Sequence, residues 1–255
     1  MSAPSDRLRE VYERRAELHY AAPVAEPDGR VDLKFARMTE LTAETFPAGS
    51  LLDAGCGDGR FLAALAKLPT CPARLVGCDI SERILKTASA AVERSGRAAE
   101  LVRANLELLP FPDASFERVL SVQVIEHLLE PTAGIRELAR VLQPGGKLVL
   151  STDNTRNYVS RMLNLPRTAV VRALRLRGKR AQVTFPHRSF TRDEVVSAMH
   201  ECGLAVEHVE TFRIHIDGVH APSIQRRLNA IEKAVPAHGW GDILAVVAHK
   251  PGDAP

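Results

Sequence analysis

The stretch LLDAGCGDGRF, residues 51–61, decides the fold of this chain. An apolar run ends in Asp53 and leads directly into glycines at positions 55, 57 and 59, after which the apolar spacing of a helix begins. Glycines between a strand and a helix let the backbone approach a ligand closely and leave helix N–H groups facing it. The spacing differs from the G-x-G-x-x-G of nicotinamide-binding turns, because residue 60 is arginine. Asp53 would repel a pyrophosphate and instead suits a cationic ligand.

A second acid, Asp79, ends the next apolar run, ARLVGCDI, at residues 73–80. A carboxylate at that place can accept hydrogen bonds from both hydroxyls of a ribose. The alternative is a cap on the following helix, for which Ser81 is also suited. Together the glycines and the two acids indicate a nucleoside with a positively charged group, and S-adenosylmethionine, a sulfonium, fits this description.

Apolar strand patterns and helical patterns alternate along most of the chain. The N-terminal residues 6–46 have mainly helical spacing, and short connections join the later segments. This alternation predicts a parallel sheet with helices on both faces. We expect strands at 50–55, 73–80, 99–106, 115–125, 147–154, 204–214 and 242–250, and helices at 59–68, 81–96, 131–142, 191–203 and 222–235. Residues 143–146 (QPGG) are expected to end the helix at 131–142.

With these motifs, residues 35–155 resemble a class I S-adenosylmethionine-dependent methyltransferase. The resemblance implies an α/β fold with a doubly wound, Rossmann-like sheet of seven strands, the last strand antiparallel and inserted beside the fifth. It also implies that the backbone around Asp53, Gly55 and Gly57 holds the methionine part of the cofactor. Asp79 would then bind the ribose hydroxyls, and Ile80 would pack on the adenine.

The resemblance extends to the segments after the third and fourth strands. RANLELLPF, residues 103–111, resembles the adenine loop of that family. By this likeness Asn105 would accept a hydrogen bond from the exocyclic amine, and Leu106 would present its backbone. Gln123, in SVQVIEHLLEP (residues 121–131), would lie beside the cofactor at the open end of the sheet.

Two subfamilies share a sharper pattern, the ubiquinone-biosynthesis O-methyltransferases and the small-RNA 3′-end 2′-O-methyltransferases. Both have an E-x-x-E-H stretch and a distant histidine that hold a divalent metal against substrate hydroxyls. The resemblance assigns Glu126 and His127, with His187 of FPHRSFTRDE (residues 185–194), to a Mg²⁺, Mn²⁺ or Zn²⁺ site. Gln123 replaces the first carboxylate, which weakens binding of a hard cation. The alternative is a structural Glu126–His127 pair with His187 as a pocket residue.

Either alternative supports the same reaction. Methyl transfer is an in-line displacement at an activated carbon, so the protein positions the acceptor and removes its proton. A metal would lower the pKa of the acceptor hydroxyl, whereas without one His127 or His187 would be the base. Catalytic roles therefore fall to Glu126, His127 and His187. Tyr12 and Tyr20 on the leading helices either close over the cofactor or pack in the core.

The positive charge is concentrated in one segment. Residues 154–192 hold ten of the 34 lysines and arginines and none of the 31 acids, so the rest of the chain is net acidic. A basic amphipathic stretch binds anionic membranes or an anionic chain. Since the ubiquinone-type enzymes carry an insertion at the same place, we expect a lid at 154–190 that contacts an anionic membrane through 156–180. RNA is less favoured, because few aromatic residues accompany the arginines.

The composition is that of an ordinary globular protein, with 45% hydrophobic and 25% charged residues. Four cysteines without paired spacing, and a charged N-terminus without the apolar region of a signal peptide, predict a cytoplasmic protein.

We expect one domain over 1–255, with N-terminal helices at 6–46, a cofactor-binding core at 47–153, the lid at 154–190 and the rest of the core at 191–251. The predicted function is methylation of a small or lipid-like acceptor at a hydroxyl. The alternatives are an RNA 2′-O-methyltransferase and a non-catalytic S-adenosylmethionine-binding scaffold.

Overall fold

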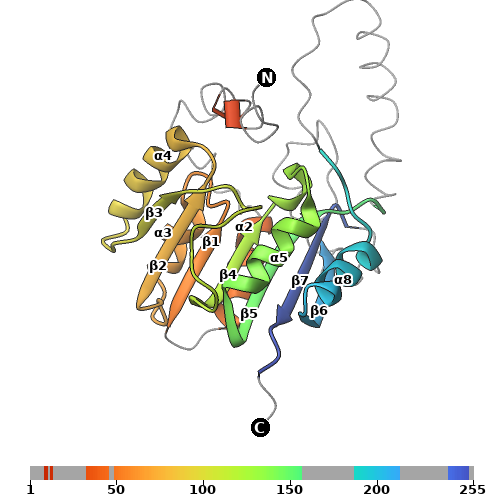
Figure 1. The fold of residues 1–255 in the computed structure, drawn as a ribbon. Helices are drawn as coiled ribbons and strands as arrows, with labels where there is room; N and C mark the ends of the chain where they lie inside the picture. Colours follow the sequence, from red (N-terminus) through yellow and green to blue (C-terminus); the bar gives the residue numbers. More distant parts are fainter. Residues whose placement is uncertain are drawn as a thin grey trace, which may run out of the picture.

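The computed structural model describes residues 9–10, 12–13, 33–45, 49–156, 187–212 and 241–252. A single seven-stranded sheet runs through this part of the chain, and helices cover both of its faces (Figure 1). The strand order is β3-β2-β1-β4-β5-β7-β6. The strands are β1 (Ser50–Ala54), β2 (Arg74–Asp79), β3 (Glu100–Arg103), β4 (Phe116–Val122), β5 (Leu142–Asp153), β6 (Ala205–Phe212) and β7 (Ile243–His249).

The direction of the strands sets where a ligand can bind. Strands β1 to β5 are mutually parallel, whereas β7 lies between β5 and β6 and is antiparallel to both. The expected fold class and the expected place of the antiparallel last strand are therefore confirmed. Because the carboxyl ends of β1, β2, β4 and β5 meet at one edge, the residues that follow these strands come together there.

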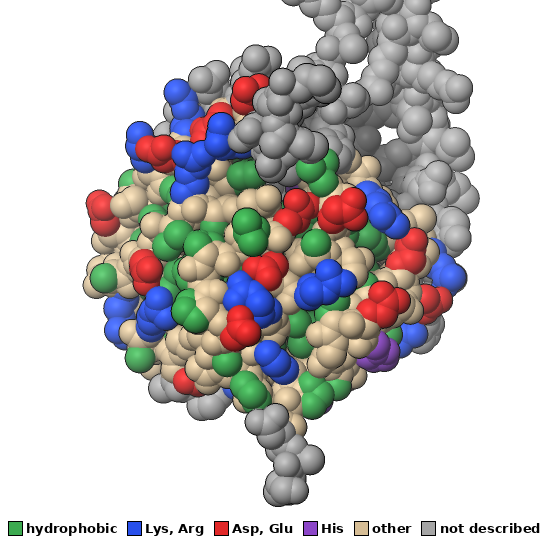
Figure 2. Space-filling view, viewed as in Figure 1, with side chains coloured by type: hydrophobic (Ala, Val, Ile, Leu, Met, Phe, Trp, Pro, Cys, Tyr) green, Lys and Arg blue, Asp and Glu red, His purple; other side chains and the backbone are tan. Residues whose placement is uncertain are grey.

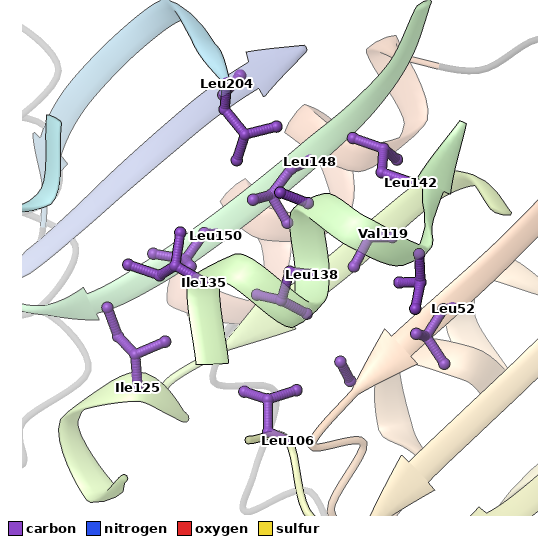
Figure 3. Packing of buried hydrophobic residues seen from close by; sticks show 14 of the residues in the cluster. Leu52, Leu106, Val119, Ile125, Ile135, Leu138, Leu142, Leu148, Leu150 and Leu204 are labelled. Atoms are coloured by element: carbon purple, nitrogen blue, oxygen red, sulfur yellow. The ribbon is translucent and has the colours of Figure 1, made fainter. Parts of the chain in front are cut away.

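The helices divide the core into two layers. On one face lie α2 (Leu33–Glu44), α3 (Arg60–Leu65) and α4 (Glu82–Glu93), and on the other lie α5 (Pro131–Val141) and α8 (Arg192–Glu201). Successive strand residues point to opposite faces, so Leu51 packs in one layer and Leu52 in the other. Figure 3 shows the layer beneath α5, where Ile135 and Leu138 pack on the strand residues Val119 and Leu148. Burial on both faces explains the nearly continuous apolar strands.

Strand β5 begins earlier than the sequence predicts. The turn-forming residues 143–146 were expected to close the preceding helix, yet they belong to β5, which starts at Leu142 opposite Phe116. Gly145 donates from its N–H to the carbonyl of Lys250, and Lys250 donates to that of Gly146. Pairing with the end of the last strand thus overrides the local turn preference of proline and glycine. The helix expected at 222–235, most of 6–32 and residues 157–186 of the lid lie outside the described residues, and the four sections of the domain stay predictions.

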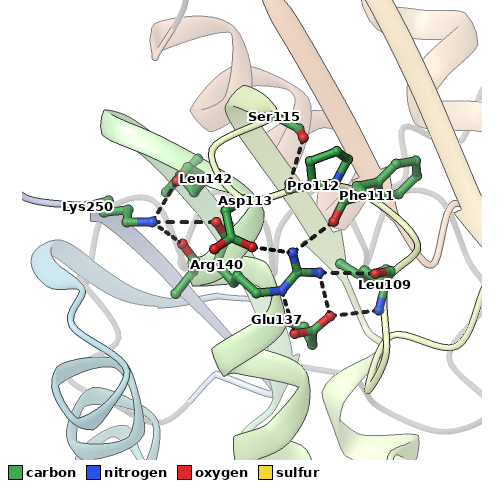
Figure 4. A network of polar contacts seen from close by, with 10 residues as sticks. Leu109, Phe111, Pro112, Asp113, Ser115, Glu137, Arg140, Leu142 and Lys250 are labelled. Carbon is green, nitrogen blue, oxygen red and sulfur yellow. Dashed lines mark hydrogen bonds and ion pairs between the residues drawn. The ribbon is translucent and has the colours of Figure 1, made fainter.

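Arginine 140 fixes the loop between β3 and β4 onto α5. Its guanidinium donates to the carbonyls of Leu109 and Phe111 and pairs with Glu137 and Asp113 (Figure 4). The hydrogen bond from Arg140 lowers the pKa of Glu137. The expected adenine loop is therefore anchored at its far end by half-buried and exposed polar contacts.

The surface shown in Figure 2 carries basic and acidic side chains interspersed over α5 and its surroundings. This face therefore offers no large area of one charge sign. Of the basic stretch 154–192, residues 154–156 and 187–192 are described, so the range 156–180, which is expected to contact a membrane, lies outside the described residues except for residue 156. Within the described ranges, every helix is too short or too polar to cross a bilayer.

Candidate functional site

Asp53, at the carboxyl end of β1, is a buried acid with no hydrogen-bond partner in the part of the chain that the structure describes. Only 1% of its surface is exposed, and neither carboxyl oxygen has a hydrogen-bond partner among the residues that the structure describes. Burial, followed by the charges of Asp79 and Asp58, raises the pKa of Asp53 to about 8. A buried acid without a partner is costly, and a cation placed against it would remove that cost. The site therefore fits a cationic ligand, as the sequence predicts.

The glycine turn follows Asp53 and is tied to the next strand. The N–H groups of Gly55 and Cys56 both donate to the carbonyl of Cys78, at 2.8 and 2.9 Å. Gly55 has a left-handed φ of 81°, and a Cβ there would collide with the side chain of Val124. A Cβ at Gly57 would instead meet open space within 4 Å. The turn is thus tightly packed on one side and open on the side where a ligand can lie.

Asp79 joins this turn to the start of α4. One carboxyl oxygen accepts from the N–H of Gly57 at 3.1 Å and the other from the N–H of Ser81 at 3.0 Å. Burial raises the pKa of Asp79. The side chain of Ser81 caps α4 by accepting from Ile84, so Asp79 is not the main cap. Each oxygen of Asp79 keeps a lone pair for a ribose hydroxyl, and the half-buried Ile80 follows it directly.

Hydrogen bonds within the expected adenine loop hold its conformation. The side-chain oxygen of Asn105 accepts from the N–H of Glu107 at 3.1 Å, and its backbone carbonyl accepts from Leu108. The side chain of Leu106 is buried in the core beneath α5. An amide oxygen has a second lone pair, so the contact of Asn105 with an exocyclic amine stays a prediction.

Gln123 adopts a strained backbone conformation at the end of β4. Its φ is 57°, in the left-handed region, and its N–H donates to the carbonyl of Ser151. Its side-chain nitrogen is buried without a hydrogen-bond partner among the described residues. Backbone strain and an unused hydrogen-bond donor are typical of a functional position. The expected role of Gln123 beside the cofactor stays a prediction.

Glu126, three residues later, faces the protein interior. It is 1% exposed, and its carboxyl group accepts a hydrogen bond from the hydroxyl of Thr152 at 2.9 Å. Burial first, and then the charge of Asp153, raise the pKa of Glu126 to about 8. This environment suits a structural, protonated acid better than a ligand for a hard cation.

The two candidate histidines are brought together from distant parts of the chain. The ring centroids of His127 and His187 lie 5.3 Å apart, edge to face. Nε2 of His187 is 3.0 Å from a carboxylate oxygen of Asp153, which ends β5. Backbone hydrogen bonds from Arg188 to Glu126 and from Phe190 to Asp153 hold the segment that carries His187. The structure thus brings His127 and His187 together with Asp153 at the carboxyl-end edge, whereas the side chain of Glu126 points into the core.

The metal site is not supported by this cluster. The described residues, which include Glu126, His127 and His187, contain no group of three or more histidine, cysteine, aspartate or glutamate side chains arranged to hold a metal ion. The physical reason is that Glu126 is turned into the core toward Thr152, and the nearest carboxylate to His187 is that of Asp153. The expectation that Glu126, His127 and His187 bind Mg²⁺, Mn²⁺ or Zn²⁺ is therefore left without structural support.

Sequence reasoning missed two acids at this edge. Asp153 ends a parallel strand as Asp79 does, and the same logic of strand ends would have found it. Glu13 accepts hydrogen bonds from the hydroxyl of Ser81 and the N–H of Glu82, at 3.0 and 2.8 Å. No local pattern indicates this contact, because it joins residues almost seventy positions apart.

Comparison with known proteins agrees with this geometry. Residues 52–150 match the family model described as a methyltransferase domain. A "Probable S-adenosylmethionine-dependent methyltransferase" of Mycobacterium tuberculosis is 43% identical over 108 residues, which are 42% of this chain and 36% of that protein. A ubiquinone biosynthesis O-methyltransferase of Parvibaculum lavamentivorans is 30% identical over 159 residues, 62% of this chain and 59% of the relative. The chain thus spans less than two thirds of the length of these curated relatives.

Solved structures share the fold at low identity. The 4+2 cyclase SpnF superimposes with a TM-score of 0.67 at 20% identity, covering 98% of each chain. A methyltransferase from Mesorhizobium loti that depends on S-adenosylmethionine gives a TM-score of 0.60 at 20% identity, covering 86% of this chain and 98% of that one. One fold therefore carries proteins named for different reactions, and the reaction has to be argued from the site.

Proposed function

We propose, from the premise that this chain carries a class I S-adenosylmethionine-dependent methyltransferase domain, that the protein methylates a hydroxyl group of a small or lipid-like molecule. The observation that carries this proposal is the His187–Asp153 pair beside His127, at the same edge as the unpartnered Asp53. When bound, S-adenosylmethionine supplies a methyl group activated by its sulfonium. A hydroxyl acceptor must also lose a proton, and the histidine pair is suited to take it.

The residues around the cofactor divide the work of binding. Asp53, once ionised, offsets the positive charge of the methionine part. The open space beside Gly57 admits that part, and Asp79 accepts from the ribose hydroxyls. Each group is fixed by the turn between β1 and α3 or by the end of β2, so the cofactor would be oriented before the acceptor arrives.

His187 is oriented as a base by Asp153. A carboxylate only accepts hydrogen bonds, so Nε2 of a neutral His187 carries the proton that faces Asp153. Nδ1 is then unprotonated and able to accept a proton from the acceptor hydroxyl. During methyl transfer Nδ1 would take the proton of the acceptor hydroxyl, and Asp153 would stabilise the resulting imidazolium. His127 packs edge-on against this ring and holds its plane.

An apolar acceptor is supported by the loops around the cluster. Two large hydrophobic side chains stand exposed in the described part of the chain, Leu108 at 77% and Leu129 at 40%. They lie on the loops that follow β3 and β4, and Glu107 on the first loop accepts from the N–H of Glu130 on the second. Peripheral contact of residues 156–180 with an anionic membrane is part of this proposal, and it would bring such an acceptor to the same edge.

The test is methyl transfer by the full-length chain from radiolabelled S-adenosylmethionine to three acceptors. These are a catechol, a catechol with an isoprenoid tail, and a short RNA with a free 3′ end. We expect the tailed catechol to be methylated fastest. Preferential methylation of RNA would replace the proposed acceptor, and no incorporation into any of the three would contradict the proposal.

Variants of the cluster test the assigned base. His187→Ala and Asp153→Asn should lower kcat by about a hundredfold or more, with a small change in KM, as expected for loss of general-base catalysis. The matched control is His200→Ala, since His200 is an exposed histidine on α8 away from the cluster. Unchanged turnover of both cluster variants would contradict the assignment. A rate abolished by EDTA and restored by Mg²⁺ would also contradict it.

A further inference from the structure

Two adjacent residues from the N-terminal part of the chain contact opposite sides of the cofactor site. Tyr12 packs its ring edge-on against His127, with 5.9 Å between ring centroids. Glu13 accepts hydrogen bonds from the hydroxyl of Ser81 and the N–H of Glu82. We call Tyr12 and Glu13 the strap. Both residues lie outside the matched methyltransferase domain.

The sheet order shows what the strap crosses. Ser81 and Glu82 begin α4 directly after β2, whereas His127 follows β4. In the sheet, β1 lies between β2 and β4, so neighbouring strand spacing separates the two contact points by about 10 Å. The carboxyl end of β1 carries Asp53 and the glycine turn. A strap that touches both neighbours therefore passes over the turn that receives the methionine part of the cofactor.

The contact at Glu13 is the polar end of the strap. Its carboxylate accepts from two donors at the N-terminal end of α4, and a negative charge there is favourable. It also lies near enough to Asp79 for its charge to favour the neutral form of that acid. Glu13 is thus the second carboxylate on the ribose side of the site.

We infer that Glu13 is a residue for cofactor retention, whose bonds to the start of α4 hold the strap over bound S-adenosylmethionine. The strap has to open for the cofactor to enter or leave, and the bonds to Ser81 and Glu82 set how often it opens. Weakening them raises the open fraction, so association and dissociation of the ligand both become faster. The inference depends on the cofactor and not on the proposed acceptor.

The test measures binding kinetics of S-adenosylhomocysteine to the full-length chain by surface plasmon resonance. This probe needs no acceptor, so failure of the proposed acceptor would leave the result interpretable. Glu13→Ala removes both hydrogen bonds to the start of α4, so both rate constants should rise by at least about tenfold, the factor expected from losing even one charge-assisted hydrogen bond. Glu13→Gln keeps the length and one acceptor oxygen, so its rates should lie between those of Glu13→Ala and the unmodified chain.

The matched control is Glu10→Ala, which removes an exposed acid three positions before Glu13. Its rate constants should stay within twofold of those of the unmodified chain. Rates of Glu13→Ala within that same range would overturn the inference, and so would an equal acceleration in Glu10→Ala. A thermal midpoint within a few degrees of the unmodified chain shows that each variant is folded. If Glu13→Ala fails this check, Glu13→Gln alone decides between the outcomes.

Discussion

Affinity for S-adenosylmethionine should rise steeply with pH because Asp53 has to ionise. With its pKa raised to about 8 by burial, this carboxyl group is protonated at neutral pH in the free protein. A cationic ligand stabilises the ionised form, so binding includes the loss of a proton. Below pH 8 the association constant should increase nearly tenfold per pH unit and level off above it.

The size of the effect follows from the ionised fraction of Asp53. That fraction is about 1% at pH 6 and about 50% at pH 8 for a pKa of about 8. Affinity should therefore rise about fiftyfold over this range, equivalent to about 2.3 kcal/mol. At pH 7 each binding event should release about 0.9 proton from Asp53, since about nine tenths of that group is protonated in the free protein.

Isothermal titration calorimetry in buffers of different ionisation enthalpy measures both quantities. Asp53→Asn cannot lose a proton, so its affinity should be weaker at pH 8 and its pH dependence should keep only the titration of the ligand. Asp193→Asn is the matched control, because it makes the same change at an exposed acid of α8, away from the turn that carries Asp53. Equal proton release by the unmodified chain and Asp53→Asn would refute the reasoning.

Three further predictions concern stability, each measured by urea unfolding. Gly59 and Gly96 share a left-handed φ near 77°, but only at Gly59 would an added Cβ lie 2.8 Å from Ala88 Cα. Gly59→Ala should therefore lower the free energy of unfolding by about 1–3 kcal/mol more than Gly96→Ala does. Equal losses in the two variants would exclude the clash. Lys250→Met removes an ammonium that donates to carbonyls at the end of α5 (Figure 4) and should cost about 1–3 kcal/mol, whereas an unchanged midpoint would count against this anchor. Burial holds the pKa of Glu126 at about 8, above its ordinary 4.5. The free energy of unfolding of the unmodified chain should therefore fall, relative to that of Glu126→Gln, as the pH rises from about 4.5 to about 8. Parallel pH profiles of the two proteins would contradict this.

The fold was predictable because local and global signals agree in the core. The glycine turn, the acid after β2 and the alternation of strands and helices each indicate the same architecture, and the resemblance supplied the antiparallel β7. The predicted start of β5 was wrong because the turn preference of residues 143–146 is a local signal. Their pairing with Lys250, which overrides that preference, joins residues far apart in the chain. Sequence patterns register residues close in the chain and miss bonds that only the folded backbone creates.

The candidate site was predictable to the extent that strand ends reveal it. Asp53 and Asp79 lie at the carboxyl ends of β1 and β2, and His127 lies in the short 3-10 helix after β4, so their convergence follows from parallel pairing. The pairing of His187 with Asp153 instead depends on a segment that returns to β5 after more than thirty residues. Likewise, the inward turn of Glu126 depends on Thr152 across the sheet, which is why a metal ligand was expected where a buried acid lies.

The antiparallel strand β7 has an evolutionary consequence. Because β6 runs parallel to β5, the chain leaves β6 at Phe212 and starts β7 at Ile243 on the carboxyl-end edge, where these two residues pair. The connection after β5 also departs there and returns at Phe190, which bridges Asn154. The described residues that flank both long connections thus lie at the carboxyl-end edge, where we propose that the acceptor binds. Exchange of either connection between relatives can alter acceptor preference while leaving the cofactor turn and the strand pairing intact.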